Sequence, residues 1–139
     1  MKRVFADAWF YIALLDADDQ GHARAAAWSR DFNGKVITTR WVLAEAANSL
    51  ALPALRRAMA AFLARVESDP DVCIAADSDT LYTRGLALYA ARPDKEWSLT
   101  DCISFVVMAD EALSESLTGD RHFEQAGFTA LLISQDDGF

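Results

Sequence analysis

Short apolar runs rich in β-branched residues alternate along the chain with longer segments in which apolar residues recur at helical spacing. Polar residues or turn signals such as Asn33-Gly34 separate the two kinds of segment. The short runs predict five strands, over residues 3–6, 35–38, 72–75, 116–118 and 130–133. The longer segments predict helices over about 9–15, 22–32, 39–50, 53–68, 78–91, 98–113 and 122–125.

This alternation of strands and helices favours an α/β fold, in which helices cover both faces of a parallel sheet. No linker or repeat divides the sequence, so a single domain over residues 1–139 is expected. In an open sheet of this kind, ligands bind beyond the carboxyl ends of the strands, close to where the strand order reverses. Polar residues at those ends are therefore the first candidates for function.

The charge of the chain limits how it could handle a nucleic acid. The formal net charge is −8 at pH 7, with 13 basic residues against 21 acidic ones. This balance excludes a broad basic surface of the kind that binds nucleic acid through its phosphates. A polyanionic substrate would have to be bound at a local site or with the help of cations.

The cysteines and the N-terminal segment indicate a cytoplasmic protein. Cys73 and Cys102 lack zinc-binding spacing and are expected to be buried free thiols in a reducing compartment. The apolar segment after Lys2-Arg3 is interrupted by Asp7 and has no convincing cleavage site, which argues against a signal peptide. Since no apolar run is long enough to span a bilayer, no membrane partner is expected.

Two aspartates lie at carboxyl ends of predicted strands. Asp7 follows the first strand directly and is flanked by apolar residues, while Asp120 ends the fourth strand in Thr118-Gly119-Asp120. Gly119 would allow an unusual backbone angle or the close approach of a ligand. Either aspartate could instead be an ordinary N-cap of the helix that follows. Taken singly, each is as well explained by capping as by function.

Two further carboxylates lie on predicted helices. Asp101 matches a capping box that begins at Ser98, and the helix dipole would hold its first-turn carboxylate in the ionised form. A capping carboxylate can also bind a metal, so the two interpretations are compatible. Glu45 has small neighbours that let other elements approach it, although alone it resembles a surface glutamate. Glu45 is a candidate because it would add a fourth carboxylate to Asp7, Asp101 and Asp120.

A set of carboxylates without a converging histidine or cysteine indicates a hard, oxygen-preferring cation, Mg²⁺ or Mn²⁺. His22 and His122 are interpreted as polar contacts or caps near helix starts and are left out of the set. Bound cations would face a phosphodiester in place of a basic surface and could activate water for its hydrolysis.

The chain resembles the PIN-domain ribonucleases over essentially its whole length. The resemblance rests on the order Asp7, Glu45, Asp101 and Asp120, and above all on "WSLTDCISF" and "LTGDRHFEQAGF", which are similar to the third and fourth acidic motifs of that family. Many small free-standing proteins of this kind are VapC-type toxins of type II toxin–antitoxin pairs.

The resemblance implies a three-layer α/β/α sandwich with a five-stranded parallel sheet in the order 3-2-1-4-5, which brings Asp7 and Asp120 together. It implies an endoribonuclease that depends on Mg²⁺ or Mn²⁺, with Asp7, Glu45, Asp101 and Asp120 as catalytic and metal-binding residues. Thr118 matches a position at which the family often places a supporting hydroxyl. The implied partners are an RNA substrate, a cognate antitoxin and a second copy of the chain in a homodimer.

The chain departs from the family pattern at one position, and two alternative functions remain open. Trp9 stands where the family often has a small hydroxyl residue, and either core packing or stacking on a base would suit it. A catalytically silent PIN-like binding module would keep the fold without the activity. A phospho-receiver domain would also be a parallel α/β fold with an acidic pocket. It is disfavoured because Asp7 has no acidic neighbour and no lysine follows Ile133.

Overall fold

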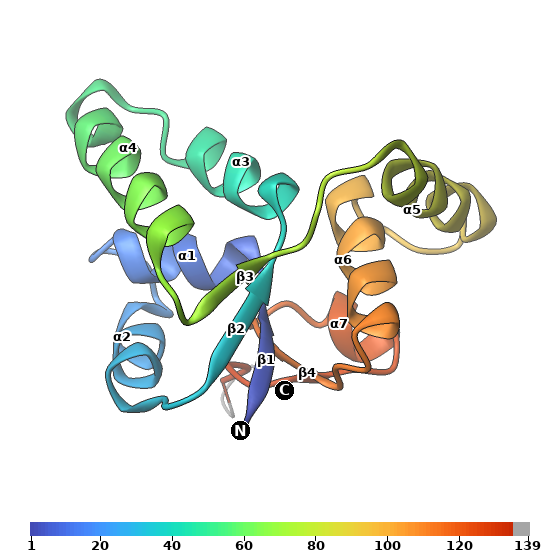
Figure 1. Cartoon of the computed structure of the whole chain (residues 1–139). Helices are drawn as coiled ribbons and strands as arrows, with labels where there is room; N and C mark the ends of the chain where they lie inside the picture. Colours follow the sequence, from blue (N-terminus) through green and yellow to red (C-terminus); the bar gives the residue numbers. More distant parts are fainter. Residues whose placement is uncertain (135–139) are drawn as a thin grey trace.

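A computed structural model of the chain describes residues 1–134 and contains a five-stranded parallel sheet in the order β3-β2-β1-β4-β5 (Figure 1). The fold class predicted from the sequence is therefore confirmed, including the strand order. The strands are β1 (Arg3–Ala6), β2 (Lys35–Thr38), β3 (Val72–Ile74), β4 (Glu115–Leu117) and β5 (Thr129–Ala130). Phe5 in β1 pairs with Ile37 in β2 and with Ser116 in β4, which sets β1 and β4 side by side.

Helices lie on both faces of the sheet and over its carboxyl end. They are α1 (Ala8–Leu15), α2 (His22–Asp31), α3 (Arg40–Ser49), α4 (Pro53–Ser68), α5 (Asp79–Ala91), α6 (Leu99–Asp110) and α7 (His122–Gln125). In Figure 1, α1, α2 and α4 lie on one side of the sheet and α5, α6 and α7 on the other, with α3 near the end at which the strands finish. α3 also contacts α6, so it connects the two helical layers above the sheet.

Local sequence signals explain where several helices begin. The Thr39 hydroxyl accepts a hydrogen bond from the Val42 N–H and so caps α3. Pro53 occupies the first turn of α4, where its missing N–H costs nothing. Ser98 and Asp101 form the predicted capping box at the start of α6. α6 then buries most of its side chains and packs against α5, α3 and α7, which anchors the helix that carries Asp101.

The core consists of the apolar faces of the strands and of the helices that pack on them. Val4, Phe5 and Ala6 of β1 are fully buried, as expected for the central strand of a sheet covered on both faces. Phe123 of α7 is also fully buried and packs edge-on against Phe105 of α6, at 5.0 Å between ring centroids. The first residues of α6 and α7 are thereby fixed relative to the sheet.

Some predicted boundaries and one burial prediction are wrong. β5 ends at Ala130 and not at residue 133, although the Leu131 and Leu132 N–H groups still donate to carbonyls of Ser116 and Thr118. α6 ends at Asp110, and the chain turns at Ala112, whose φ is 55°. Cys102 is buried as predicted, whereas Cys73 is exposed because β3 is an edge strand.

Among residues 1–134, no helix is long and apolar enough to cross a membrane.

Candidate active site

Asp7 lies at the carboxyl end of β1 with its side chain buried. Asp7 occupies the N-cap position of α1, as the capping interpretation expects, but its side chain makes no cap hydrogen bond to that helix within the described part of the chain. Its Oδ2 instead accepts a hydrogen bond of 2.8 Å from the hydroxyl of Thr118, just beyond β4. The same hydroxyl accepts a hydrogen bond of 3.0 Å from the Asp120 N–H. Thr118 therefore connects the Asp7 carboxylate to the loop that carries Asp120.

Asp101 comes from the first turn of α6 and is also buried. Its Oδ2 accepts a hydrogen bond of 3.0 Å from the Ser98 N–H, while its own N–H donates to the Ser98 hydroxyl at 3.0 Å. The capping box thus holds the carboxylate in one orientation. The residue is a helix cap and a member of the acidic cluster at once, as the sequence suggested.

Asp120 and Glu45 complete the acidic cluster from two more elements. Asp120 Oδ1 accepts a hydrogen bond of 2.9 Å from the His122 N–H, and this turn leads into α7. Glu45 lies on α3 and is half-buried. Its charge contributes to the raised pKa of Asp7, and the charges of Asp101 and Asp120 contribute to its own raised pKa. The structure therefore brings together all four carboxylates selected from the sequence.

Burial and repulsion between negative charges both disfavour the ionised forms of Asp7, Asp101 and Glu45. Burial, with the negative charges of Asp101 and Glu45, raises the pKa of Asp7 to about 7, in spite of the Thr118 hydrogen bond. Burial is also the main reason that the pKa of Asp101 and that of Glu45 are raised, and the charge of Asp120 adds to both shifts. A bound cation would reverse this effect by favouring the charged forms.

The prediction that no histidine converges on the carboxylates is wrong. His122 Nδ1 lies 3.2 Å from Asp101 Oδ2 and 3.4 Å from Asp120 Oδ1. One ligand atom from each of these three residues can be chosen so that all lie within 4.8 Å of one another. The close spacing of His122 to Asp120, two residues apart at the start of a helix, was the available signal. His22 behaves as predicted, since its Nδ1 is 2.8 Å from the Ala13 carbonyl oxygen.

Trp9 packs against the loop that carries Asp120, which explains Gly119 differently from the sequence analysis. A Cβ on Gly119 would lie 2.5 Å from the Trp9 indole, and one on Gly21 would also collide with that ring. The positive φ of a described glycine occurs at Gly127 and not at Gly119. Gly119 therefore makes room for Trp9. The guanidinium of Arg24 lies 5.8 Å from the centre of the indole.

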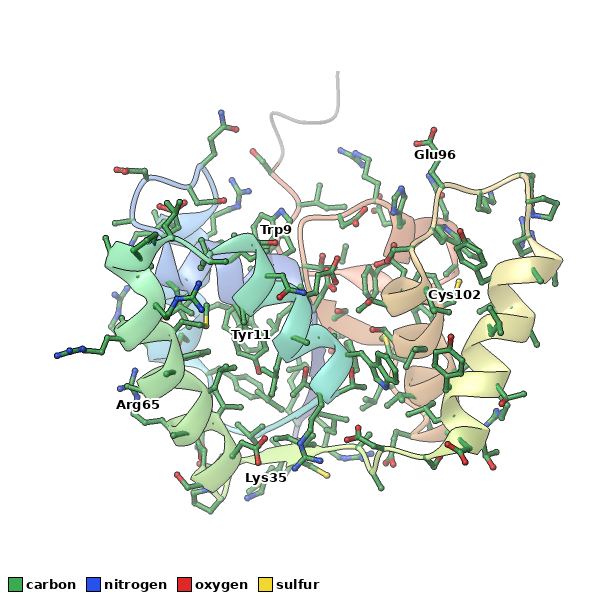
Figure 2. The ribbon with its side chains drawn as sticks, turned by 90° about the horizontal axis from the view of Figure 1, so that it is seen from above. Trp9, Tyr11, Lys35, Arg65, Glu96 and Cys102 are labelled. Atoms are coloured by element: carbon green, nitrogen blue, oxygen red, sulfur yellow. The ribbon has the colours of Figure 1, made fainter. Side chains whose placement is uncertain are left out.

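Trp9 is therefore half-buried and wedged between two glycines, which agrees with a packing role (Figure 2). In the view from above, Trp9 lies near the middle of the molecule, between the helices of the two layers. Its indole separates Gly21, at the start of α2, from Gly119, next to Asp120. We infer that it fixes the position of the Asp120 loop.

The donor set of the cluster fits a divalent cation. Within residues 1–134, the internal hydrogen bonds occupy Oδ2 of Asp101 and Oδ1 of Asp120 and leave the other oxygen of each without a donor. Carboxylate oxygens are the ligands that Mg²⁺ and Mn²⁺ prefer. Among the described residues, Asp101 and Asp120 belong with His122 to a group whose ligand atoms lie within 4.8 Å of one another, and Asp7 and Glu45 are outside that group.

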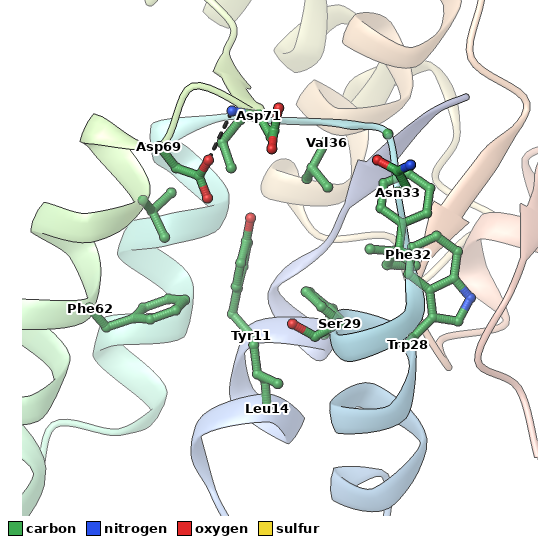
Figure 3. A pocket seen from close by; sticks show the side chains of 15 residues that line it. Tyr11, Leu14, Trp28, Ser29, Phe32, Asn33, Val36, Phe62, Asp69 and Asp71 are labelled. Carbon is green, nitrogen blue, oxygen red and sulfur yellow. Dashed lines mark hydrogen bonds between the residues drawn. The ribbon is translucent and has the colours of Figure 1, made fainter. Parts of the chain in front are cut away.

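A separate pocket of about 250 Å³ lies between α1, α2, α4 and the amino-terminal ends of β2 and β3 (Figure 3). Phe62, Trp28 and Phe32 form apolar walls, and the Tyr11 hydroxyl points toward Asp69 and Asp71. Burial raises the pKa of Tyr11, so its hydroxyl stays neutral. None of the four carboxylates of the cluster is among the described residues that line this pocket.

The sheet order and the convergent carboxylates define a PIN-like α/β domain. Known structures agree with this class. VapC20 of Mycobacterium tuberculosis, a sarcin-ricin loop cleaving toxin, matches with a TM-score of 0.85 and 25% sequence identity, over 92% of this chain and 98% of VapC20. FitAcB from Neisseria gonorrhoeae shares the fold, with a TM-score of 0.60 and 17% identity over 91% of this chain and 94% of that one. No protein-family model and no curated protein sequence matches the chain. The predicted resemblance is confirmed by these structures.

Proposed function

We propose that the protein is a metal-dependent endoribonuclease and the toxin of a type II toxin–antitoxin pair. The observation that carries the proposal is the convergence of Asp7, Glu45, Asp101 and Asp120 from four separate elements at the carboxyl end of the sheet. Open α/β sheets bind their ligands at this end. The likeness to VapC20, a toxin that cleaves the sarcin-ricin loop, supports RNA as the substrate class.

Mg²⁺ or Mn²⁺ is the proposed cofactor, with the four carboxylates as its ligands. When bound, such an ion supplies charge stabilisation and lowers the pKa of a water molecule for attack on phosphorus. The chain itself supplies the preorganisation. Thr118 orients Asp7 through the 2.8 Å hydrogen bond, and the Ser98 N–H orients Asp101. The fixed carboxylates need no rearrangement when the substrate phosphate arrives.

The phospho-receiver alternative is contradicted by the topology. Receiver domains have the strand order 2-1-3-4-5, whereas this sheet has the order β3-β2-β1-β4-β5. A catalytically silent PIN-like module has the same fold and remains the alternative. The set of four carboxylates is intact, and burial disfavours the ionised forms of Asp7, Glu45 and Asp101 in the absence of a cation, which favours the enzyme.

RNA cleavage by the purified protein tests this proposal. We expect endonucleolytic products from structured RNA in the presence of Mg²⁺ or Mn²⁺ and none after chelation with EDTA, with activity restored when the metal is added back. The products are followed on denaturing gels with end-labelled RNA. A preparation that cleaves equally well in EDTA would exclude the metal-dependent mechanism. One that binds metal without cleaving any RNA offered would favour the silent module.

The proposed antitoxin would inhibit by placing an arginine among the carboxylates. A guanidinium pairs with carboxylates through two parallel hydrogen bonds and would compete with the cation. The aromatic pocket between α2 and α4 offers an anchor for an apolar side chain of the same partner (Figure 3). Arg56 and Arg57 of α4 are exposed and could meet acidic residues of the antitoxin.

Replacing that arginine of the antitoxin by alanine should restore RNA cleavage while the complex stays assembled, because the pocket contacts remain. The partner to test is a small protein encoded beside this gene, co-purified with the chain. Cleavage and size-exclusion chromatography are measured on the same sample. Trp28→Ala, which removes a wall of the pocket, should instead weaken the complex. An assembled but inactive arginine variant would show that inhibition is steric.

We also propose a single domain over residues 1–139, a homodimer and a cytoplasmic location. Support for the homodimer comes from α5, on which Tyr82, Leu86 and Tyr89 form one exposed apolar face, with exposed fractions of 38%, 42% and 49%. Exposed apolar faces of this kind are typical of interaction surfaces.

A further inference from the structure

We infer that His122 is a direct metal ligand, so that the site binds Co²⁺, Ni²⁺ and Zn²⁺ more tightly, relative to Mg²⁺, than an all-carboxylate site would. This inference rests on the proposed function, because it assumes that the carboxylate cluster holds a cation. It adds a nitrogen donor to a set for which the sequence indicated oxygen ligands alone.

The geometry places a ring nitrogen of His122 among the carboxylates. Nδ1 lies 3.2 Å from Asp101 Oδ2 and 3.4 Å from Asp120 Oδ1. The ligand atoms of the three residues lie within 4.8 Å of one another, so a small inward movement would bring all three to bond lengths of about 2.0–2.2 Å from one ion. The neutral tautomer with its proton on Nε2 has a lone pair on Nδ1.

Neighbouring contacts fix the imidazole in this position. The His122 N–H donates to Asp120 Oδ1 at 2.9 Å, which ties the first residue of α7 to a second member of the ligand set. Phe123, the next residue, is fully buried and packs against Phe5 and Phe105. The ring therefore projects from an anchored backbone into the site, and a cation could bind with little movement of the chain.

A nitrogen donor changes which metals the site prefers. Imidazole suits Co²⁺, Ni²⁺ and Zn²⁺, and affinity among divalent ions rises from Mn²⁺ through Co²⁺ and Ni²⁺, whereas Mg²⁺ favours oxygen ligands. A second interpretation of the contacts is that His122 only donates a hydrogen bond to Asp101 and so positions the carboxylates. The two roles differ in their effect on different metals, because a positioning residue would influence all of them alike.

The test compares wild type, His122→Gln and His22→Gln. The chain has two histidines, and His22→Gln is the matched control because His22 contacts the Ala13 carbonyl and none of the carboxylates. Binding of Co²⁺ is read from its visible absorption. Binding of Zn²⁺, Mn²⁺ and Mg²⁺ is read from the metal-induced rise in melting temperature. Neither readout depends on cleavage.

We expect His122→Gln to lose at least about tenfold in affinity for Co²⁺ and Zn²⁺, since even residues that support a ligand from outside cost 10–100-fold when mutated. The loss for Mg²⁺ should be much smaller, and the Co²⁺ spectrum should change because a nitrogen ligand is removed. His22→Gln should match wild type for every metal.

An equal loss of affinity for all four metals in His122→Gln would overturn the inference in favour of positioning. Unchanged affinities would overturn it as well. A different result would contradict the metal site of the proposed function itself. The test is the double variant that carries both Asp7→Asn and Asp120→Asn. If it shows the same metal-induced rise in melting temperature as wild type, the cation binds elsewhere, and the proposed metal site and the proposed role of His122 are both wrong.

Discussion

Asp101→Asn is expected to lower the rate of RNA cleavage by on the order of 10³-fold while leaving the fold intact. A metal ligand that is lost from the site removes several kcal/mol of transition-state stabilisation, and each ~1.4 kcal/mol corresponds to a factor of ten in rate. Asparagine keeps the size of the side chain and an oxygen that can still accept from the Ser98 N–H, so the capping box survives. The cleavage rate under saturating Mn²⁺, with circular dichroism as the check on folding, measures the effect.

Asp110→Asn is the matched control for this variant. It makes the same change of charge on the same helix, at the opposite end of α6. There Asp110 pairs with Arg84 at 2.6 Å on the surface, where solvent screens the charges and an ion pair adds little to stability. The control should cleave RNA at the wild-type rate. If a folded Asp101→Asn protein did the same, Asp101 would be a helix cap and nothing more.

The fold could be predicted because its signals are local. β1 and β2 are apolar runs ended by polar residues, and Thr39, Pro53 and Ser98 mark the starts of the helices that follow. The strand order came from the resemblance to the PIN domains and not from periodicity. The end of β5 was missed because a short edge strand has few pairing partners to define where it stops.

Three carboxylates of the candidate site could be selected from the sequence because Asp7 and Asp120 lie at strand ends and Asp101 at a helix cap, whereas Glu45, in the middle of α3, was added only as the fourth member of the set. The residues that surround these carboxylates in the fold could not be predicted from the sequence. Gly119 was interpreted as room for a ligand, whereas it makes room for Trp9, and the two residues are more than 100 positions apart in the chain. His122 was set aside because a histidine at a helix start usually makes ordinary polar contacts. Only the packing of α7 beside α6 brings it to Asp101.

Asp7→Asn is expected to make the metal-free protein more stable at neutral and alkaline pH while abolishing cleavage. The folded protein holds the pKa of Asp7 at about 7, well above its ordinary value of 3.8. Between these two pH values, the folded state keeps a proton that the unfolded state has lost. The free energy of unfolding of wild type therefore falls as pH rises through this window and stays lowered above it.

The asparagine variant has no proton to lose at this position, and its amide oxygen can still accept the hydrogen bond from Thr118. Removing the charge also relieves the repulsion that it exerts on Asp101 and Glu45. At pH 8 in EDTA, the variant should unfold at a temperature higher by roughly 5 °C or more than wild type, and the difference should shrink toward pH 4.

Added Mn²⁺ should reduce or reverse this difference in unfolding temperature, because wild type binds the cation more tightly. Thermal unfolding at several pH values, with and without metal, measures both effects. Parallel stability curves for the two proteins in EDTA would show that Asp7 is ionised at little cost in the folded state, and that neither its burial nor repulsion from Asp101 and Glu45 destabilises the metal-free site.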